Sequence, residues 1–381
     1  MTEQGRKHRV MVLFGGRSAE HEISILSARF VVESLDRERF EPVLVGITKE
    51  GRWVRESEAA LLAQSRDPRL VKLNAATAEV HLAARPASGT ALAMRRRAEL
   101  LVDGGAQPID VVFPVLHGPL GEDGTLQGLL RLAEVPFVGS GVLGSAVGMD
   151  KDVMKRLFRE AGLPIVPHVT LRAIDRRRRG AALADEALAV GAGGPVFVKP
   201  ANLGSSVGVS KVTSRSDAER ALELAFSFDE KVVVERGVAG VREIECGVLG
   251  NDEPIASAVG EIVVTHRDGF YSYDAKYVDP DGSHTRIPAD LPPDEVRRAQ
   301  ELAVRAFDVL GCEGLARVDF FRSSSGELFL NEVNTLPGFT AISMYPKLFE
   351  AAGIGAKELV TRLVDLALER AAARAALRTS A

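Results

Sequence analysis

The stretch LFLNEVNTLPGF, residues 328–339, begins as an apolar strand and ends at a Pro-Gly break. Side chains alternate between the two faces of a strand, so Glu332 and Asn334 are expected to point the same way. A strand that ends with an acid and an amide on one face, just before a turn, is typical of a site rather than of a plain core strand.

The segment before this stretch predicts its partner strand. LARVDFF, residues 315–321, leads through Ser324-Ser325-Gly326 into it, which indicates an antiparallel hairpin. Asp319 would then face Glu332 and Asn334, and three hard oxygen donors without histidine or thiolate suit Mg²⁺. The alternative is a polar exposed face of an edge hairpin. The apolar neighbours predict a buried sheet, where unpaired carboxylates are costly, and this favours a metal.

Composition excludes several classes of protein. The 381 residues are enough for two or three domains, and a net charge of −4 argues against an extended nucleic-acid surface. Cys246 and Cys312 cannot build a disulfide framework and are expected to be buried thiols in a reducing compartment. The first apolar run, Val10 to Phe14, is too short for a signal peptide, and no stretch has the length of a membrane span. We therefore expect a cytoplasmic protein that binds neither nucleic acid nor membrane.

The N-terminal part alternates apolar runs with helical patterns. This rhythm predicts a doubly wound, parallel α/β domain. The strands are expected in RVMVLFGG, PVLVGI and IDVVFPVLHG, and the helices at about 23–35 and 125–135. Residues 52–105 are rich in Ala, Arg and short polar runs and are interpreted as a peripheral insertion.

From Met149 the pattern changes to an α+β type. PVFVKP, VGVSKV, KVVVERG and REIECGVLG have β-type composition, and two long helical patterns lie at about 292–311 and 357–377. The loop KPANLGSSVGVS carries Lys199, Gly204, Ser205, Ser206 and Gly208, which suits phosphate because glycines let backbone N–H groups approach its oxygens. It lacks the Gly-Lys-Ser/Thr of a P-loop, and a flexible hairpin loop is the alternative.

Three further stretches carry polar groups that could serve a site. HGPLGEDGTLQG begins at His117, where an open α/β sheet faces its ligand crevice, although its acids could simply be N-terminal helix charges. The same alternative applies to Glu20 and Glu22 in GGRSAEHEIS. DGFYSYDAKYVDP places Lys276 in an aromatic-rich loop, which is typical of a lid, with a self-packed surface loop as the alternative.

Together these stretches resemble the D-alanine–D-alanine ligases of the ATP-grasp superfamily. HEIS, HGPLGEDGTLQG, GMDK, VKPANLGSSVGVSKV, REIECGVLG, FYSYDAKY, ARVDFF and NEVNTLPGFT occur in that family's order, between about Val10 and Leu348. The resemblance implies an N-terminal α/β domain followed by a two-subdomain ATP-grasp fold. The expected domains are 1–145 for substrate binding, 146–238 for the central subdomain, and 239–381 for the C-terminal subdomain with the metal site and loop 265–287.

The resemblance also implies a reaction. The γ-phosphoryl group of ATP passes to the carboxylate of one D-alanine, and the amine of a second D-alanine attacks the acyl phosphate. Two Mg²⁺ ions, replaceable by Mn²⁺, would be held by Asp319, Glu332 and Asn334, with Glu332 bridging them. Arg317 and the backbone N–H of Gly338 would stabilise the oxyanion. The implied ATP-binding residues are Lys151, Lys199, Ser205, Ser206, Glu235, Glu243 and Lys276.

The implied substrate contacts involve a second group of residues. Glu22, with Ser205 and Tyr277 as its hydrogen-bonded partners, matches the carboxylate that pairs with the first D-alanine's ammonium group. His117 and Lys276 belong to the matching substrate motifs, and Ser343 matches the serine that binds the second carboxylate. Gly237 departs from the family, which often has an aromatic residue there, so the adenine contact at this position is in doubt.

Rival functions remain open at the level of sequence. D-alanine–D-lactate ligases resemble the chain but lack the AKY pattern around Tyr277, and another ATP-grasp carboxylate–amine ligase is a further alternative. A dinucleotide-dependent oxidoreductase would need Gly-x-Gly-x-x-Gly after the first strand, where the chain has GGRS. A non-catalytic nucleotide-binding regulator would be expected to have lost the acids and cations that are present here. The sequence does not set the oligomeric state, and a homodimer is compatible with it.

Overall fold

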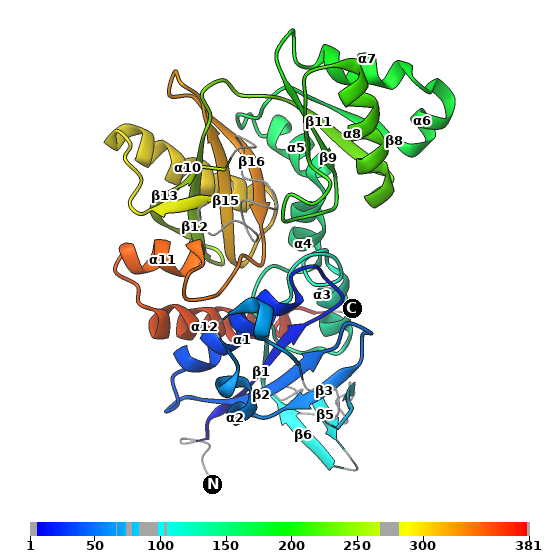
Figure 1. Ribbon diagram of the computed structural model, residues 1–381. Coiled ribbons are helices and arrows are strands. Elements are labelled where there is room, and N and C mark those ends of the chain that lie inside the picture. Colours follow the sequence, from blue (N-terminus) through cyan, green and yellow to red (C-terminus); the bar gives the residue numbers. More distant parts are fainter. Residues whose placement is uncertain are drawn as a thin grey trace.

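The computed structural model describes residues 6–65, 67–73, 78–83, 98–102, 105–266 and 282–378. Within these ranges the strands form four sheets. Figure 1 shows two of them side by side in the upper half of the molecule, above the N-terminal sheet. Among the described residues, no helix is both long and apolar enough to serve as a membrane span.

The N-terminal sheet has the strand order β3-β2-β1-β7. β1 pairs in parallel with β2 and β7, and this confirms the predicted parallel core. β3 pairs antiparallel with β2 at the edge, so this part of the expected insertion belongs to the main sheet. Its four residues alternate burial, a signal too short to stand out in the sequence. The elements are β1 (His8–Gly15), α1 (His21–Ser34), β2 (Phe40–Ile47), β3 (Trp53–Glu56) and β7 (Val111–Pro114).

A small antiparallel sheet and several helices surround this core. β4 and β5 of the expected insertion form this sheet with β6, and a bridge between Val54 of β3 and Glu79 links it to the N-terminal sheet. These elements are α2 (Glu58–Ala63), the 3₁₀ helix η1 (Pro68–Leu70), β4 (Val80–Ala83), β5 (Ala98–Val102), β6 (Gly105–Ile109), α3 (Thr125–Leu132), α4 (Val142–Met149) and α5 (Lys151–Glu160).

The middle of the chain forms an antiparallel sheet of order β10-β9-β11-β8. Apolar residues of α7 and α8 pack on it and form a separate core cluster. The elements are β8 (His168–Arg172), α6 (Ala173–Arg179), α7 (Ala182–Ala189), β9 (Val196–Pro200), β10 (Ser210–Val212), α8 (Arg215–Phe228) and β11 (Lys231–Arg236).

The C-terminal sheet has the order β14-β13-β12-β15-β16. β15 and β16 are the predicted hairpin, joined by the residues around Ser324-Ser325-Gly326. α10 covers one face, and its buried Leu302 and Phe307 pack with Val318 and Phe320 of β15. The elements are β12 (Arg242–Gly250), β13 (Ile255–Val264), β14 (Ser283–Arg286), α10 (Pro293–Val309), β15 (Gly314–Arg322), β16 (Leu328–Asn334), α11 (Met344–Ala351) and α12 (Ala356–Ala375).

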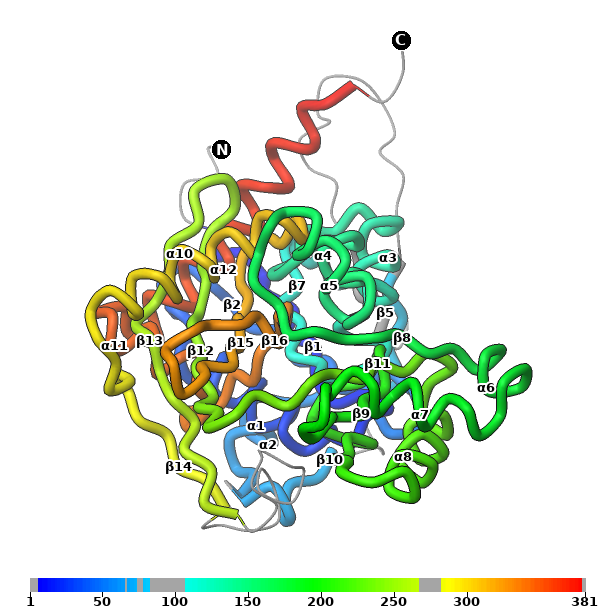
Figure 2. The backbone as a smooth tube through the Cα atoms, turned by 90° about the horizontal axis from the view of Figure 1, so that it is seen from above, coloured from blue at the N-terminus to red at the C-terminus, as the bar shows by residue number. Residues whose placement is uncertain are grey.

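One hydrophobic core joins the two ends of the chain. Phe14 of β1 and Val31 of α1 belong to the same buried cluster as Phe339, Tyr345 and Leu363. In Figure 1, α12 lies between the C-terminal sheet and the N-terminal sheet, and Figure 2 shows its last turns extending away from the body of the molecule. The hydrophobic core beside the N-terminal sheet is therefore completed by residues more than three hundred positions later in the chain.

Candidate active site

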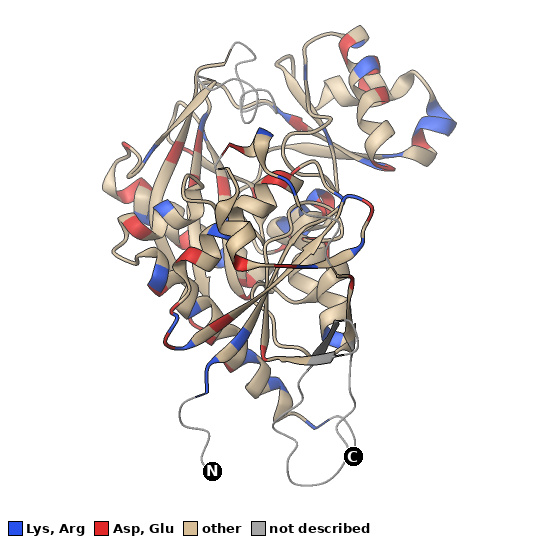
Figure 3. Ribbon diagram, turned by 60° about the horizontal axis from the view of Figure 1, so that its bottom comes forward, with Lys and Arg blue, Asp and Glu red and all other residues tan. Residues whose placement is uncertain are grey.

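A cleft lies between the central and the C-terminal sheets. Its lining comes from β9 and β11 on one side and from β12, β15 and β16 on the other. The predicted residues that line it are Lys151, Lys199, Ser206, Glu235, Glu243, Arg317, Asp319 and Glu332. Figure 2 shows from above that the two sheets stand side by side, and Figure 3 shows acidic and basic residues interspersed along the helices and strands.

Three acids form a row across the C-terminal sheet. Glu245 of β12 is the cross-strand partner of Asp319 on β15, and Asp319 is the partner of Glu332 on β16. Residues directly opposite each other on neighbouring strands share a face of the sheet, so all three carboxylates line the cleft. Asn334 Nδ2 donates a hydrogen bond of 2.9 Å to Asp319 Oδ2. The structure thus brings together the three residues predicted to bind metal, and it adds Glu245.

The Arg317 guanidinium contacts two acids of this row, Glu245 and Asp319. Its Nε and Nη2 each donate a hydrogen bond of 2.7 Å to the Asp319 carboxylate, and Nε also lies 3.0 Å from Glu245 Oε2. Burial alone would lower the pKa of Arg317, but the charges of Asp319 and Glu245 raise it well above its ordinary value. Arg317 is therefore a permanent, partly buried cation in the lining of the cleft.

A β-bulge in the hairpin brings one more side chain into the cleft. The pairing of β15 with β16 shifts register between Asp319 and Phe320, so Asn331 and Glu332 both line the cleft while Leu330 is buried in the core. Such bulges re-aim side chains near functional sites. Asn331 Oδ1 accepts a hydrogen bond of 3.2 Å from Lys199, and its backbone carbonyl accepts one of 3.2 Å from Lys155.

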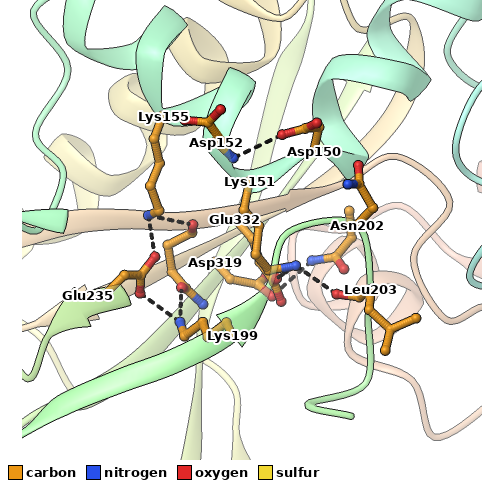
Figure 4. Close-up of polar contacts among 12 residues, drawn as sticks. Asp150, Lys151, Asp152, Lys155, Lys199, Asn202, Leu203, Glu235, Asp319 and Glu332 are labelled. Carbon is orange, nitrogen blue, oxygen red and sulfur yellow. Dashed lines mark hydrogen bonds and ion pairs between the residues drawn. The ribbon is translucent and has the colours of Figure 1, made fainter. Parts of the chain in front are cut away.

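Two lysines hold one buried carboxylate on the opposite wall, as Figure 4 shows. Lys199 Nζ donates a hydrogen bond of 2.7 Å to Glu235 Oε2, and Lys155 Nζ lies 2.8 Å from Oε1. Burial would raise the pKa of Glu235, but the charges of both lysines lower it well below its ordinary value. Lys155 is fully buried and was not predicted as a site residue. It lies one helical turn after Lys151, a spacing that could have indicated it.

Lys151 connects the glycine-serine loop with the acidic row. It is the first residue of α5, and its Nζ donates a hydrogen bond of 2.8 Å to the Leu203 carbonyl. The same Nζ lies 3.2 Å from Glu332 Oε2 (Figure 4). A cation on an α-helix N-terminus is unfavourable for the helix dipole, so these partners, rather than the helix, favour Lys151 here.

The backbone of the loop after β9 has a conformation that would let an anion approach it closely. Ser205 and Ser206 adopt positive φ angles of 54° and 58°, and Gly208 has a φ of 72°. A Cβ on Gly208 would lie 2.8 Å from the Phe228 ring and 2.9 Å from Pro200, so only glycine fits this turn. Ser205 and Ser206 lie in a turn closed by a hydrogen bond of 3.2 Å from the Val207 N–H to the Gly204 carbonyl, and successive N–H groups of turns can form a concave site for an anion. Ser206 lines the cleft, whereas Ser205 is not among its lining residues.

The predicted substrate residues Glu22, His117, Gly338 and Ser343 are contributed by α1, the segment after β7 and the segment before α11. Glu22 Oε1 accepts a hydrogen bond of 2.7 Å from Lys49. Burial would raise the pKa of Glu22, but this bond, a backbone hydrogen bond and the charge of Lys49 together lower it. His117 Nδ1 donates to the Leu336 carbonyl at 3.1 Å and therefore ties the N-terminal part to the segment that carries Gly338.

Gly338 and Ser343 are close neighbours. A Cβ on Gly338 would lie 3.1 Å from Ser343 Oγ, and that hydroxyl accepts a hydrogen bond of 3.0 Å from the Thr340 N–H. The proposed oxyanion donor and the proposed carboxylate-binding serine thus belong to one ordered turn. Lys276 and Tyr277 lie outside the described residues, so their predicted contacts stay predictions.

The donor chemistry of the cleft fits a hard divalent cation. Within the described ranges, no three His, Cys, Asp or Glu side chains are gathered into a ready-made metal cage. Asp319 and Glu332, with the Asn334 amide, instead offer a few oxygen ligands on an open surface beside Lys151 and Arg317. Mg²⁺ prefers this kind of site because it keeps waters or shares its ligands with phosphate oxygens.

The chain is similar to known proteins over nearly its whole length. Residues 9–140 match the family model described as D-ala D-ala ligase N-terminus, and residues 157–365 match D-ala D-ala ligase C-terminus. The chain is 50% identical to D-alanine–D-alanine ligase A of Escherichia coli K12, over 98% of this chain and 99% of that protein. It is also 50% identical to the D-alanine–D-alanine ligase of Shouchella clausii, over 96% and 95%.

Two solved structures are similar over nearly the whole chain. The D-alanine–D-alanine ligase from Coxiella burnetii has a TM-score of 0.80 and 36% identity, with 97% of each chain covered. The D-Ala:D-Ser ligase from Enterococcus faecalis also has a TM-score of 0.80, with 34% identity and coverage of 95% of this chain and 100% of that one. The predicted ATP-grasp fold is confirmed, and the chain belongs to the D-alanine–D-alanine ligase family.

Proposed function

We propose that the protein joins two D-alanine molecules into D-alanyl-D-alanine at the expense of ATP, as a step in peptidoglycan precursor synthesis. The observation that carries the proposal is the cleft in which Arg317, Lys151 and Lys199 converge with Asp319 and Glu332. Phosphorylation of a carboxylate brings two anions together, and a cleft with several fixed cations supplies the electrostatic stabilisation that this step needs.

The residues on the two walls of the cleft have different roles. Lys151 and Lys199 neutralise phosphate oxygens, and the Ser205–Ser206 turn donates backbone N–H groups to them. Glu235 and Glu243 contact the adenine and ribose side of ATP. Arg317 stabilises the charge that develops on the acyl phosphate and on the tetrahedral intermediate. Because these cations are already gathered in the cleft before substrate arrives, the electrostatic stabilisation does not depend on recruiting them from solvent.

The D-alanine–D-alanine ligase family uses ATP and a divalent metal. In this chain Asp319, Glu332 and Asn334 would hold two Mg²⁺ ions, for which Mn²⁺ could substitute. When bound, the metal supplies positive charge to the phosphate oxygens.

The amino acids are expected beside the segments that carry Glu22 and Ser343. Glu22 pairs with the ammonium group of the first D-alanine, with Ser205 and Tyr277 as its partners. His117 and Lys276 complete the substrate contacts. Ser343 binds the carboxylate of the second D-alanine, and the Gly338 N–H donates to the oxyanion. A loop carrying Lys276 and Tyr277 would exclude water from the acyl phosphate.

A different acceptor is the second candidate. The D-Ala:D-Ser ligase from Enterococcus faecalis has the same TM-score as the D-alanine–D-alanine ligase from Coxiella burnetii, so the fold does not select between amine acceptors. The sequence around Tyr277 favours D-alanine over a hydroxy acid such as D-lactate.

Product analysis tests the proposal. The protein is incubated with ATP, MgCl₂ and D-alanine, and ADP release and dipeptide formation are measured by a coupled assay and mass spectrometry. We expect D-alanyl-D-alanine and no turnover with L-alanine. Competition between D-alanine and D-serine or D-lactate reports the acceptor. Turnover with L-amino acids but none with D-alanine would overturn the assignment.

A cytoplasmic location and a homodimer complete the proposal. ATP and D-alanine are small molecules, so no nucleic-acid or membrane partner is required. Light scattering coupled to size-exclusion chromatography checks the dimer, and a monomer at micromolar concentration would exclude it.

A further inference from the structure

Glu245 is the one acid of the row that has no role in the scheme above. It lies on β12, lines the cleft, and is only 5% exposed. Its cross-strand partner is Asp319, so the two carboxylates stand next to each other on one face of the sheet. Two adjacent buried carboxylates repel each other unless a cation lies between them, and Arg317 is that cation.

The Arg317 guanidinium makes more contacts with Asp319 than with Glu245. Asp319 takes both directed hydrogen bonds, from Nε and from Nη2, at 2.7 Å. Glu245 Oε2 lies 3.0 Å from the same Nε in an ion pair. Asp319 Oδ2 also accepts from Asn334 Nδ2 at 2.9 Å. Oδ2 of Asp319 thus already accepts two hydrogen bonds and Oδ1 accepts one, so a cation that binds Asp319 competes with Arg317 for these oxygens.

We propose that Glu245 is a positioning residue that keeps Arg317 in the cleft when Asp319 turns to a metal ion. The inference rests on the proposed function, because it assigns Asp319 as a ligand. A largely desolvated guanidinium without a carboxylate partner is unfavourable, and the Arg317 side chain is only 18% exposed, so a second acid stabilises Arg317 when its contact with Asp319 weakens. Glu245 provides this acid at the same Nε, and the Nη groups then remain available for a phosphate or an oxyanion.

The inference predicts an effect on metal affinity. In Glu245→Gln the second partner is neutral, Arg317 stays on Asp319, and it competes with the metal. Mn²⁺ binding to the complex with ADP, measured by electron paramagnetic resonance, is expected to weaken about 10-fold, the size typical for residues that support a metal ligand. ADP binding without metal, measured by calorimetry, should be unchanged.

Glu295→Gln is the matched control. Glu295 accepts two hydrogen bonds, of 2.6 and 2.8 Å, from Arg322 on the same strand β15, but it does not line the cleft. It tests whether the loss of any acid–arginine pair on this strand weakens metal binding. We expect wild-type Mn²⁺ affinity in this variant. Mn²⁺ binding that falls equally in both variants, or in step with the melting temperature, would refute the inference.

A double-mutant cycle separates action through Arg317 from direct metal binding. In an Arg317→Ala background, or Arg317→Lys if the alanine variant does not fold, Glu245→Gln should change Mn²⁺ affinity by less than about twofold. An equal loss in both backgrounds would show that Glu245 contacts the metal itself and would overturn the proposal. Mn²⁺ binding needs no amino acid, so these outcomes are independent of whether the wild-type protein forms the dipeptide.

Discussion

Lys155 Nζ lies 2.8 Å from Glu235 Oε1, with both side chains almost completely buried at the wall of the nucleotide cleft. Lys199 reaches the other oxygen of the same carboxylate at 2.7 Å. Two cations around one acid leave a net positive charge in the interior. Of the two lysines, Lys199 lines the cleft, and its contact with Glu235 fixes its orientation there.

Loss of Lys155 should destabilise the fold. In Lys155→Met one oxygen of Glu235 loses its cation, and breaking a buried ion pair costs about 3–5 kcal/mol. Because Lys199 remains, we expect a loss near the lower end, about 3 kcal/mol in the free energy of unfolding, measured by urea denaturation. Lys211→Met, at an exposed position on β10, should stay within about 0.5 kcal/mol of wild type. Equal stability of the two variants would contradict the assigned role of Lys155.

Glu332→Gln should abolish turnover without unfolding the protein. The substitution keeps the shape of a side chain that faces the cleft but removes the charge opposite Asp319 and Lys151. ATP-dependent turnover is expected to fall by at least about 100-fold, the upper range for residues that only support a metal ligand. ADP release gives the rate and circular dichroism reports the fold. A variant with near-normal activity would remove Glu332 from the metal site.

The pair His117–Glu122 should make stability depend on pH. Burial would lower the pKa of His117, but the carboxylate of Glu122, 3.8 Å away, and the charge of Glu20 raise it above 6.5. A raised folded pKa means that the folded state binds more protons, so its contribution to stability is complete below pH 6.5 and is lost as pH rises through the folded value. Burial also raises the pKa of Glu122, which acts in the same direction from pH 4.5 upward.

Unfolding free energies measured at a series of pH values test this coupling. Stability should fall above pH 6.5 with a slope of at most about 1.4 kcal/mol per pH unit for one proton. Glu122→Gln should flatten the slope, whereas Glu134→Gln, at an exposed position after α3, should preserve it. A slope that survives in Glu122→Gln would assign it to other groups.

Both thiols should be unreactive in the native protein. Cys246 and Cys312 are buried, and burial raises the pKa of each to about 12. Since the thiolate is the reactive form, a disulfide reagent at pH 8 should modify neither residue within minutes. The same reagent should titrate two thiols per chain in urea. Rapid modification of the folded protein would show that β12 or the segment before β15 opens locally.

Local patterns in the sequence predicted much of the fold. The β15–β16 hairpin, the parallel pairing around β1 and the helices α10 and α12 follow from apolar periodicity and from turn residues such as Gly326. These signals need only neighbouring residues. The cross-strand pairing of Asp319 with Glu332 was also predictable, because the short turn fixes the register of the two strands.

Other parts of the site depend on contacts that no local pattern contains. The bulge that turns Asn331 into the cleft breaks the regular alternation of β16. Glu245 lies two residues after Glu243 on one strand, and this spacing could have indicated a shared face. Its neighbour Asp319, however, is distant in sequence. The roles of Lys276 and Tyr277, which lie outside the described residues, remain predictions.

The core that unites Phe14 with Phe339 and Leu363 has a consequence for synthesis on the ribosome. The N-terminal sheet emerges first, yet part of its apolar covering is translated last. Contacts of such large sequence separation form slowly, and the nascent chain must keep its early strands from aggregating meanwhile. A fragment that ends before Leu336 should therefore be recovered as an insoluble product, although it contains every strand of the N-terminal sheet.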